Sequence, residues 1–143
     1  MEKLELIAQK TEYHYDENDT NAVNFITQNG YLSLQICVYI DPGDDPPLTE
    51  PHIELDSQSG GHYGGIDSVE FHPTKVEISF RKRFLKKYDQ ISITIPWGID
   101  EEIVDFFVNY LFMGDKVTYS SEVDKKLHIT QTEFQENLDE EDD

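Results

Sequence analysis

The sequence of 143 residues is poor in cysteine and in cationic side chains. Cys37 is its only cysteine, so no disulfide can form within the chain, which suits a reducing compartment. Eleven Lys and Arg stand against 30 Asp and Glu, and the formal net charge is -19. Such a charge repels phosphate backbones and anionic bilayers. We therefore expect the protein to bind neither nucleic acid nor membranes directly.

Long apolar runs are absent as well. No run approaches the roughly 20 residues that span a bilayer, and residues 1–5 (MEKLE) lack the basic and then apolar order of a secretory signal. A hydrophobic content of 37%, with eight Tyr and eight Phe, is nevertheless too high for a wholly disordered chain. The length suits one domain. These features predict a folded, cytoplasmic, single-domain protein.

Signatures of catalysis and of cofactor binding are also missing. The sequence has no phosphate-binding glycine loop with its Lys, no zinc-binding pair of cysteines and no helical pair of histidines. From the residues we therefore predict no catalytic residue, cofactor or metal. One alternative remains open, a small metal-dependent or hydrolytic enzyme that uses His52, His62 or His72 with nearby carboxylates. The five histidines are scattered over separate predicted elements: His14, His52, His62, His72 and His128.

Alternation of apolar and polar residues predicts several strands joined by short turns. The clearest strand begins at Leu32, and Asn29-Gly30 before it predicts a hairpin with the preceding strand. A second hairpin is predicted to turn at His72-Pro73-Thr74. Short connections favour antiparallel pairing. The predicted strands lie at residues 4–8, 22–27, 32–40, 52–56, 69–71, 76–80 and 91–95.

Two segments have helical spacing. Phe84, Leu85 and Tyr88 recur among five cations, which predicts a short basic helix at 81–88. Apolar residues at offsets 0, 4, 7, 8, 11 and 12 from Ile99 predict an amphipathic helix at 100–113. The predicted fold class is therefore α+β, a single domain at 1–114 in which this C-terminal helix packs on one face of an antiparallel sheet. Residues 115–143 form an acidic extension that we expect to be largely disordered.

Candidate partner-binding residues lie in three places. A proline-rich acidic loop lacks the spacing of a calcium loop and is expected to face a basic partner. Tyr63 belongs to the cluster His62-Tyr63-Gly64-Gly65, whose glycines permit either a turn or a ligand site. Trp97 is expected either to anchor an interface or to cover a helix start. The candidates in the loop are Asp41, Asp44, Asp45 and Glu50.

A family resemblance covers about residues 31–112. It rests on Ile53-Glu54-Leu55-Asp56, on the run from His62-Tyr63-Gly64-Gly65 to Phe71, and on Lys75-Val76-Glu77-Ile78-Ser79-Phe80. These residues, and the order of the predicted elements, resemble the immunity protein 10 family of bacterial polymorphic-toxin systems. The first 30 residues and the acidic C-terminal residues have no counterpart in the resemblance. The segment 81–88 is far more basic than the alanine- and leucine-rich helix of the family.

The resemblance implies a cytoplasmic immunity protein that binds and neutralises a toxin domain encoded beside it and that is not an enzyme. The charge of -19 favours a basic toxin, such as a nuclease, because opposite charges speed association and fill a basic cleft. Two alternatives stay open beside this prediction. They are the small enzyme described above and an acidic nucleic-acid mimic without a dedicated toxin.

Overall fold

Ten strands and one short helical segment make up the part of the chain that the computed structural model describes. This part comprises residues 2–17, 19–37, 51–56, 61–63 and 65–129, and of 61–63 only the backbone is described. The helical segment consists of α1 (Glu101–Asp105) and the π-helical turn η2 (Phe106–Tyr110), and a 3-10 turn, η3, lies at Lys125–Leu127. The strands are β1 (Lys3–Ile7), β2 (Lys10–Glu17), β3 (Thr20–Ile26), β4 (Tyr31–Cys37), β5 (His52–Leu55), β6 (Gly61–Tyr63), β7 (Ile66–His72), β8 (Lys75–Phe84), β9 (Tyr88–Thr94) and β10 (Val117–Tyr119).

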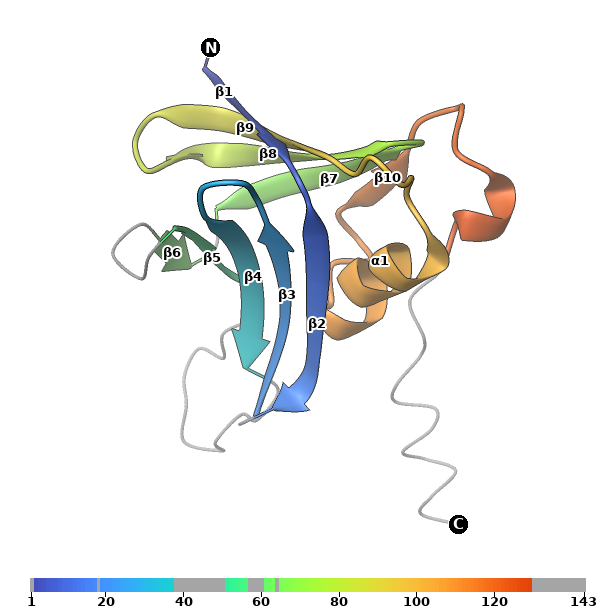
Figure 1. The fold of residues 1–143 in the computed structure, drawn as a ribbon, viewed down its shortest axis with the longest axis horizontal. Coiled ribbons are helices and arrows are strands. Elements are labelled where there is room, and N and C mark those ends of the chain that lie inside the picture. Colours follow the sequence, from blue (N-terminus) through green and yellow to red (C-terminus); the bar gives the residue numbers. More distant parts are fainter. Residues whose placement is uncertain (1, 18, 38–50, 57–60, 64, 130–143) are drawn as a thin grey trace.

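The strands form two five-stranded sheets. Sheet A has the order β1-β9-β8-β7-β10, and sheet B has the order β2-β3-β4-β5-β6. Sheet B is antiparallel throughout, whereas in sheet A β1 pairs with β9, and β10 with β7, in parallel. Figure 1 shows the strands of sheet A running across those of sheet B, with β1 leading into β2. The predicted single α+β domain is confirmed, but two sheets replace the single antiparallel sheet.

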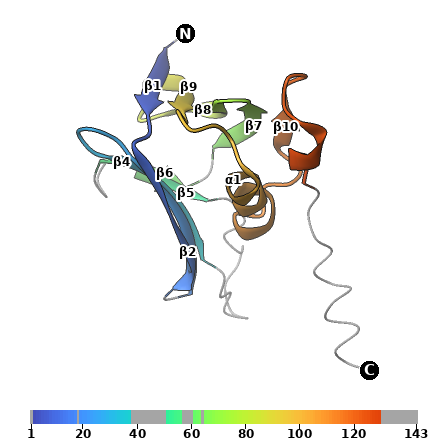
Figure 2. The ribbon, with the colours of Figure 1, turned by 45° about the vertical axis from the view of Figure 1, so that its right-hand side comes forward.

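The apolar rows of both sheets face one core. Each sheet has only one apolar face, so the two faces are buried against each other and against the helical segment. Figure 2 shows α1 beside the face of sheet B and below sheet A. Phe107 of η2 joins the layers, because its ring lies 6.4 Å from that of Phe25 on β3 and 5.5 Å from that of Phe71 on β7. All three side chains are fully buried.

Both predicted hairpins are confirmed. β3 and β4 pair around the Asn29-Gly30 turn, where the N–H of Thr27 donates to the carbonyl of Gly30. β7 and β8 pair around Pro73-Thr74, with His72 opposite Lys75. Local alternation and short turns therefore predicted these pairs correctly.

The predicted basic helix at 81–88 is wrong, because β8 runs to Phe84 and β9 begins at Tyr88. Leu85 and Lys86 form the turn between them, with φ of 54° and 57°, the left-handed conformation of tight hairpin turns. The spacing was ambiguous, since four residues are about one helical turn and also an even step along a strand. Phe80 and Phe84, four apart, stack with their ring centroids 5.5 Å apart.

The predicted helix at 100–113 is shorter in the structure and covers 101–110. Its start is as expected, since Asp100 accepts a hydrogen bond from the N–H of Ile103. Its second half is π-helical, and the N–H of Leu111 bonds to the carbonyl of Phe106. Buried residues are not confined to one stripe, because Val104 and Val108 are buried together with the predicted positions.

Ordered structure continues beyond residue 114, the predicted end of the domain. β10 extends sheet A beside β7, and Val123 is buried against the core. The part of the predicted extension from 130 to 143 lies outside the described residues. None of the helices in the described part has the length and apolar character needed to span a bilayer.

Candidate functional site

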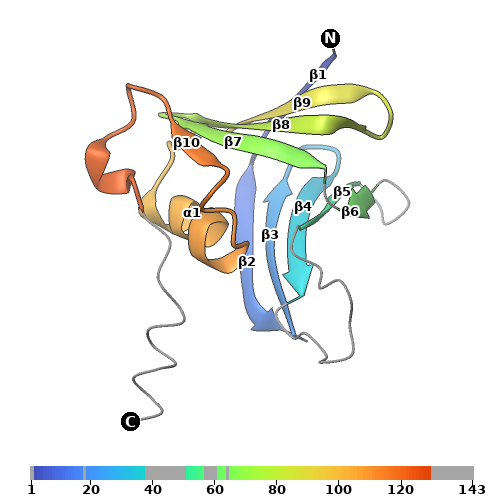
Figure 3. The same ribbon diagram turned by 180° about the vertical axis from the view of Figure 1, so that it is seen from behind.

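Strand β2 and the helical segment bring three tyrosines together at one surface. β2 is an edge strand of sheet B and lies beside α1 (Figure 3). The ring of Tyr15 lies 4.8 Å from that of Tyr110 and 5.2 Å from that of Phe106, edge to face in both pairs. Tyr13 lies 5.3 Å from Phe106, which is fully buried beneath the tyrosines. Such edge-to-face contacts stabilise the cluster beyond simple apolar burial.

The local sequence explains this meeting. Tyr13 and Tyr15 are two residues apart on a strand and therefore point to the same side, while Phe106 and Tyr110 are four apart on the helical segment. A buried side chain, Asn21 of β3, holds the two elements together. Its amide nitrogen donates to the carbonyl of Tyr110 at 3.0 Å, and its oxygen accepts from the N–H of Asp16 at 2.6 Å. Asn21 thus satisfies a carbonyl at the end of the helical segment.

Carboxylates surround the tyrosines. The hydroxyl of Tyr15 donates to Glu102 at 3.3 Å, and Asp105 accepts a hydrogen bond from Asn109 at 2.7 Å. Within the described residues neither carboxylate has a Lys or Arg partner. Burial, and then the nearby Glu102, raise the pKa of Tyr15 to about 12. The group formed by Tyr13, Tyr15, Tyr110, Glu102 and Asp105 is called the acidic tyrosine face below.

The acidic tyrosine face has the composition of a protein-binding surface. Tyr15 is 42% exposed, and Tyr13 and Tyr110 are half-buried. A tyrosine held by its neighbours offers a large contact area and loses little conformational freedom on binding. A positively charged surface would be complementary to the surrounding negative charge.

Of the residues predicted to bind a partner, the structure describes only the backbone of Tyr63 and the side chain of Trp97. Asp41, Asp44, Asp45 and Glu50 lie outside the described residues. The backbone of Tyr63 pairs with His52 at the edge of sheet B, and the side chain of Tyr63 is outside the description. Gly65 has a φ of 84° and accepts a hydrogen bond from the N–H of Arg81, so this glycine serves a turn. Trp97 is 50% exposed, which suits an interface anchor better than a cover for the helix start.

The sequence did contain a signal for the acidic tyrosine face. Thr11, Tyr13 and Tyr15 alternate with Glu12 and His14, the period of a half-buried strand. The acidic residues of this segment obscured the pattern, since Asp and Glu are depleted in strands. No local signal pairs Tyr15 with Tyr110, because 95 residues separate them and only the fold brings them together.

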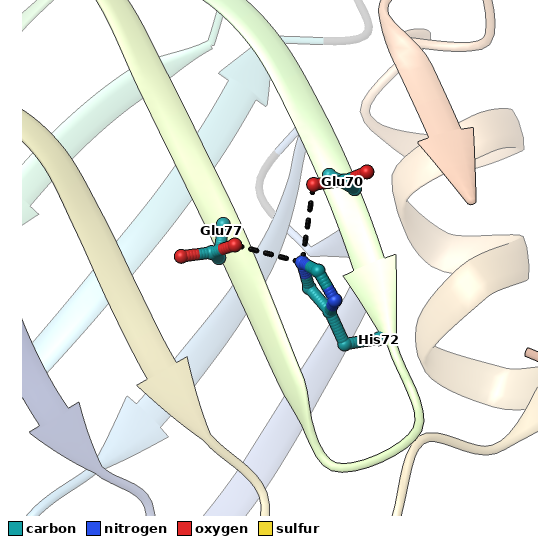
Figure 4. A group of neighbouring side chains, drawn as sticks. All are labelled: Glu70, His72 and Glu77. Carbon is teal, nitrogen blue, oxygen red and sulfur yellow. Dashed lines mark ion pairs between the residues drawn. The ribbon is translucent and has the colours of Figure 1, made fainter. Parts of the chain in front are cut away.

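A second cluster lies on sheet A and tests the enzyme alternative (Figure 4). His72 of β7 points its Nε2 toward two carboxylates, 3.1 Å from Glu70 of the same strand and 2.7 Å from Glu77 of β8. One ligand atom from each residue lies within 4.8 Å of the others. Within the described residues this is the one group of three or more such side chains that close together. Imidazole and carboxylate groups of this kind can hold a divalent metal.

Lysines neutralise part of this cluster. The ammonium of Lys3 on β1 lies 2.8 Å from Oε2 of Glu77, and that of Lys75 lies 3.9 Å from the same oxygen. Burial alone would raise the pKa of Glu77, but the hydrogen bond from Lys3 and the positive charges hold it below its ordinary value of 4.5. Glu77 is therefore ionised at neutral pH.

The other histidines are not gathered at this cluster. His52 lies on β5 of sheet B, 3.9 Å from the buried Glu54, whose carboxylate also accepts a hydrogen bond from Tyr31. His14 pairs with Glu17 on β2, and the ring of His128 stacks on Tyr119 at 4.0 Å. The side chain of His62 is outside the described residues. Within the described residues, the structure shows two carboxylates close to a ring nitrogen at His72.

Comparisons with protein-family models, with curated proteins and with solved structures found no match to this chain. The immunity function therefore stays a prediction. The acidic tyrosine face and the histidine cluster are the two candidate sites among the described residues.

Proposed function

We propose that this protein is a cytoplasmic immunity protein that binds a cognate toxin domain and neutralises it through the acidic tyrosine face. The observation that carries the choice of surface is Tyr15, a 42% exposed tyrosine on an edge strand with the carboxylate of Glu102 beside its hydroxyl. The resemblance of residues 31–112 to the immunity protein 10 family supports the choice of a toxin as the partner.

The charge of the chain supports a basic toxin. A formal charge of -19 attracts a positively charged cleft over a distance of about 8 Å at physiological salt and accelerates encounter. Glu102 and Asp105 accept hydrogen bonds from neutral donors, so their charge remains available to a partner. In the bound state, Tyr15 would insert into the cleft while the carboxylates meet its cations.

The direct test measures binding of the purified chain to the toxin domain encoded beside its gene. We expect a 1:1 complex that abolishes toxin activity. Tyr15→Ala should weaken binding by about 30-fold, mainly through faster dissociation, because a central tyrosine anchor contributes on the order of 2 kcal/mol. The double substitution Glu102→Gln with Asp105→Asn should instead slow association at low salt.

Leu85→Ala is the matched control, since Leu85 is also exposed, at 38%, but lies in the β8–β9 turn, which points away from α1 in Figures 1 and 3. It should leave toxin binding unchanged. Failure of the wild-type chain to bind the neighbouring toxin would contradict the immunity function. Tight binding that survives Tyr15→Ala would contradict the surface alone.

The acidic loop remains a rival surface. Replacing Asp41, Asp44, Asp45 and Glu50 together with Asn and Gln should lower the association rate if that loop steers the toxin. The same stopped-flow measurement on this variant and on the Glu102 and Asp105 variant separates the two surfaces.

A further inference from the structure

The outer face of sheet A holds two glutamates in direct opposition. Glu70 on β7 and Glu77 on β8 are cross-strand partners in the antiparallel register. Like charges in this relation destabilise a sheet. Lys3 and Lys75 approach Oε2 of Glu77, whereas Oε1 of Glu77 and the carboxylate of Glu70 both face His72.

The ring nitrogen between the glutamates is close to two carboxylates. Nε2 of His72 is buried and has no hydrogen bond of good geometry within the described residues. Carboxylate oxygens of Glu77 and Glu70 lie 2.7 and 3.1 Å from it. An imidazole nitrogen and carboxylate oxygens are ligands that zinc takes, so these three groups can share one ion.

We propose that Glu70, His72 and Glu77 form a binding site for one Zn²⁺ ion. In tetrahedral zinc sites the ligand atoms lie about 2.0–2.1 Å from the ion and so roughly 3.3 Å from one another. The two distances from Nε2, 2.7 and 3.1 Å, are close to this value, and all three ligand atoms lie within 4.8 Å of one another. The side chain of Glu70 is 44% exposed and is free to make such a shift.

The surrounding groups suit zinc better than calcium or magnesium. A nitrogen ligand favours zinc, while the two hard cations take oxygen ligands. Lys3 holds Oε2 of Glu77 at 2.8 Å and thereby orients Oε1 toward the site, as outer-shell partners of metal ligands do. Three protein ligands leave the fourth position to water on the exposed side of Glu70. This site does not depend on the proposed immunity function.

Isothermal titration of the full chain with Zn²⁺ at neutral pH tests the site. We expect one ion per chain with micromolar affinity, and no comparable binding of Mg²⁺. His72→Gln should lower the zinc affinity by about 100-fold, and Glu70→Gln by about tenfold or more. Co²⁺ in place of zinc should give the visible absorption of a tetrahedral site in the wild type and not in His72→Gln.

His14→Gln is the matched control, because His14 also lies beside a carboxylate, Glu17, but has only that one acidic partner. It should leave zinc binding unchanged. Glu70→Gln keeps the test decisive if His72→Gln does not fold, since the side chain of Glu70 is 44% exposed and its loss should cost little stability. Zinc affinity that is equal in the wild type, His72→Gln and Glu70→Gln would overturn the site, and so would an absence of zinc binding by the folded wild type.

Discussion

Carboxylates have opposite surroundings on the two faces described above. On the outer face of sheet A, Glu77 is 12% exposed and lies beside the ammonium groups of Lys3 and Lys75, so its charge is compensated within the protein. At the acidic tyrosine face, Glu102 is exposed and accepts a hydrogen bond from Tyr15, a neutral donor. The same residue type therefore supports the fold in one place and, within the described residues, has no cationic side chain beside it in the other.

The largest loss of stability is expected when the buried phenylalanine beneath the acidic tyrosine face is truncated. Phe106→Ala should lower the free energy of unfolding by about 3–5 kcal/mol, because Phe106 is fully buried and contacts Tyr13, Tyr15 and Tyr110. Urea denaturation followed by circular dichroism measures this loss. Phe112→Ala, at a residue that is 44% exposed, is the control and should cost less than about 1 kcal/mol. Equal losses for the two variants would mean that Phe106 does not pack beneath the acidic tyrosine face.

The next largest loss of stability is expected at Glu77, in comparison with Glu102. Glu77→Gln should lower the free energy of unfolding by about 1–3 kcal/mol at pH 7, because it removes the charge of a carboxylate that is only 12% exposed and accepts a hydrogen bond from Lys3. Glu102→Gln should change it by less than about 0.5 kcal/mol, since that carboxylate is exposed. Parallel urea titrations of both variants decide the comparison. A larger loss for Glu102→Gln than for Glu77→Gln would contradict the expected order.

The effect of Glu77→Gln should depend on pH. The folded-state pKa of Glu77 lies below the ordinary 4.5, so its stabilising contribution is complete above 4.5 and is lost as the pH falls through the folded value. The wild type and the variant should therefore converge in stability below pH 4.5. A difference that stays constant from pH 7 down to pH 3 would argue against the ion pair with Lys3.

The pKa of the Tyr15 hydroxyl should depend on the negative charge of the acidic tyrosine face. Burial and Glu102 raise its pKa to about 12, so Tyr15 stays protonated at pH 11. A raised folded pKa stabilises the protein below the ordinary value of 10, and this contribution is lost as the pH rises through 12. Glu102→Gln should lower the pKa toward 10, as measured by the difference in phenolate absorption between each protein and its Tyr15→Phe form. An unchanged pKa would place Glu102 away from Tyr15.

The smallest effect on stability is expected at Trp97. Its side chain is 50% exposed, so Trp97→Ala should change the free energy of unfolding by less than about 1 kcal/mol. If Trp97 anchors the toxin as well, the same variant should raise the dissociation rate of the complex. A stability loss of several kcal/mol would instead assign Trp97 to covering the helix start.

Local pattern determined much of the fold. The hairpins at Asn29-Gly30 and at His72-Pro73-Thr74, and the strand that becomes β9, follow from alternation and turn residues within about 20 residues of chain. The start of the helical segment also follows from local sequence, because Asp100 caps it directly. These features depend on neighbours in the chain, so the sequence alone predicts them.

Contacts between distant segments were decided by the tertiary structure alone. The spacing of Phe84 and Tyr88 suits both a helix and a strand, and pairing of β8 with β9 selects the hairpin. The contacts of Lys3 with Glu77, and of Tyr15 with Tyr110, join residues 74 and 95 positions apart. Neither pair leaves a periodic trace in the sequence, because such proximity arises only when the apolar faces of two sheets and a helix are buried together.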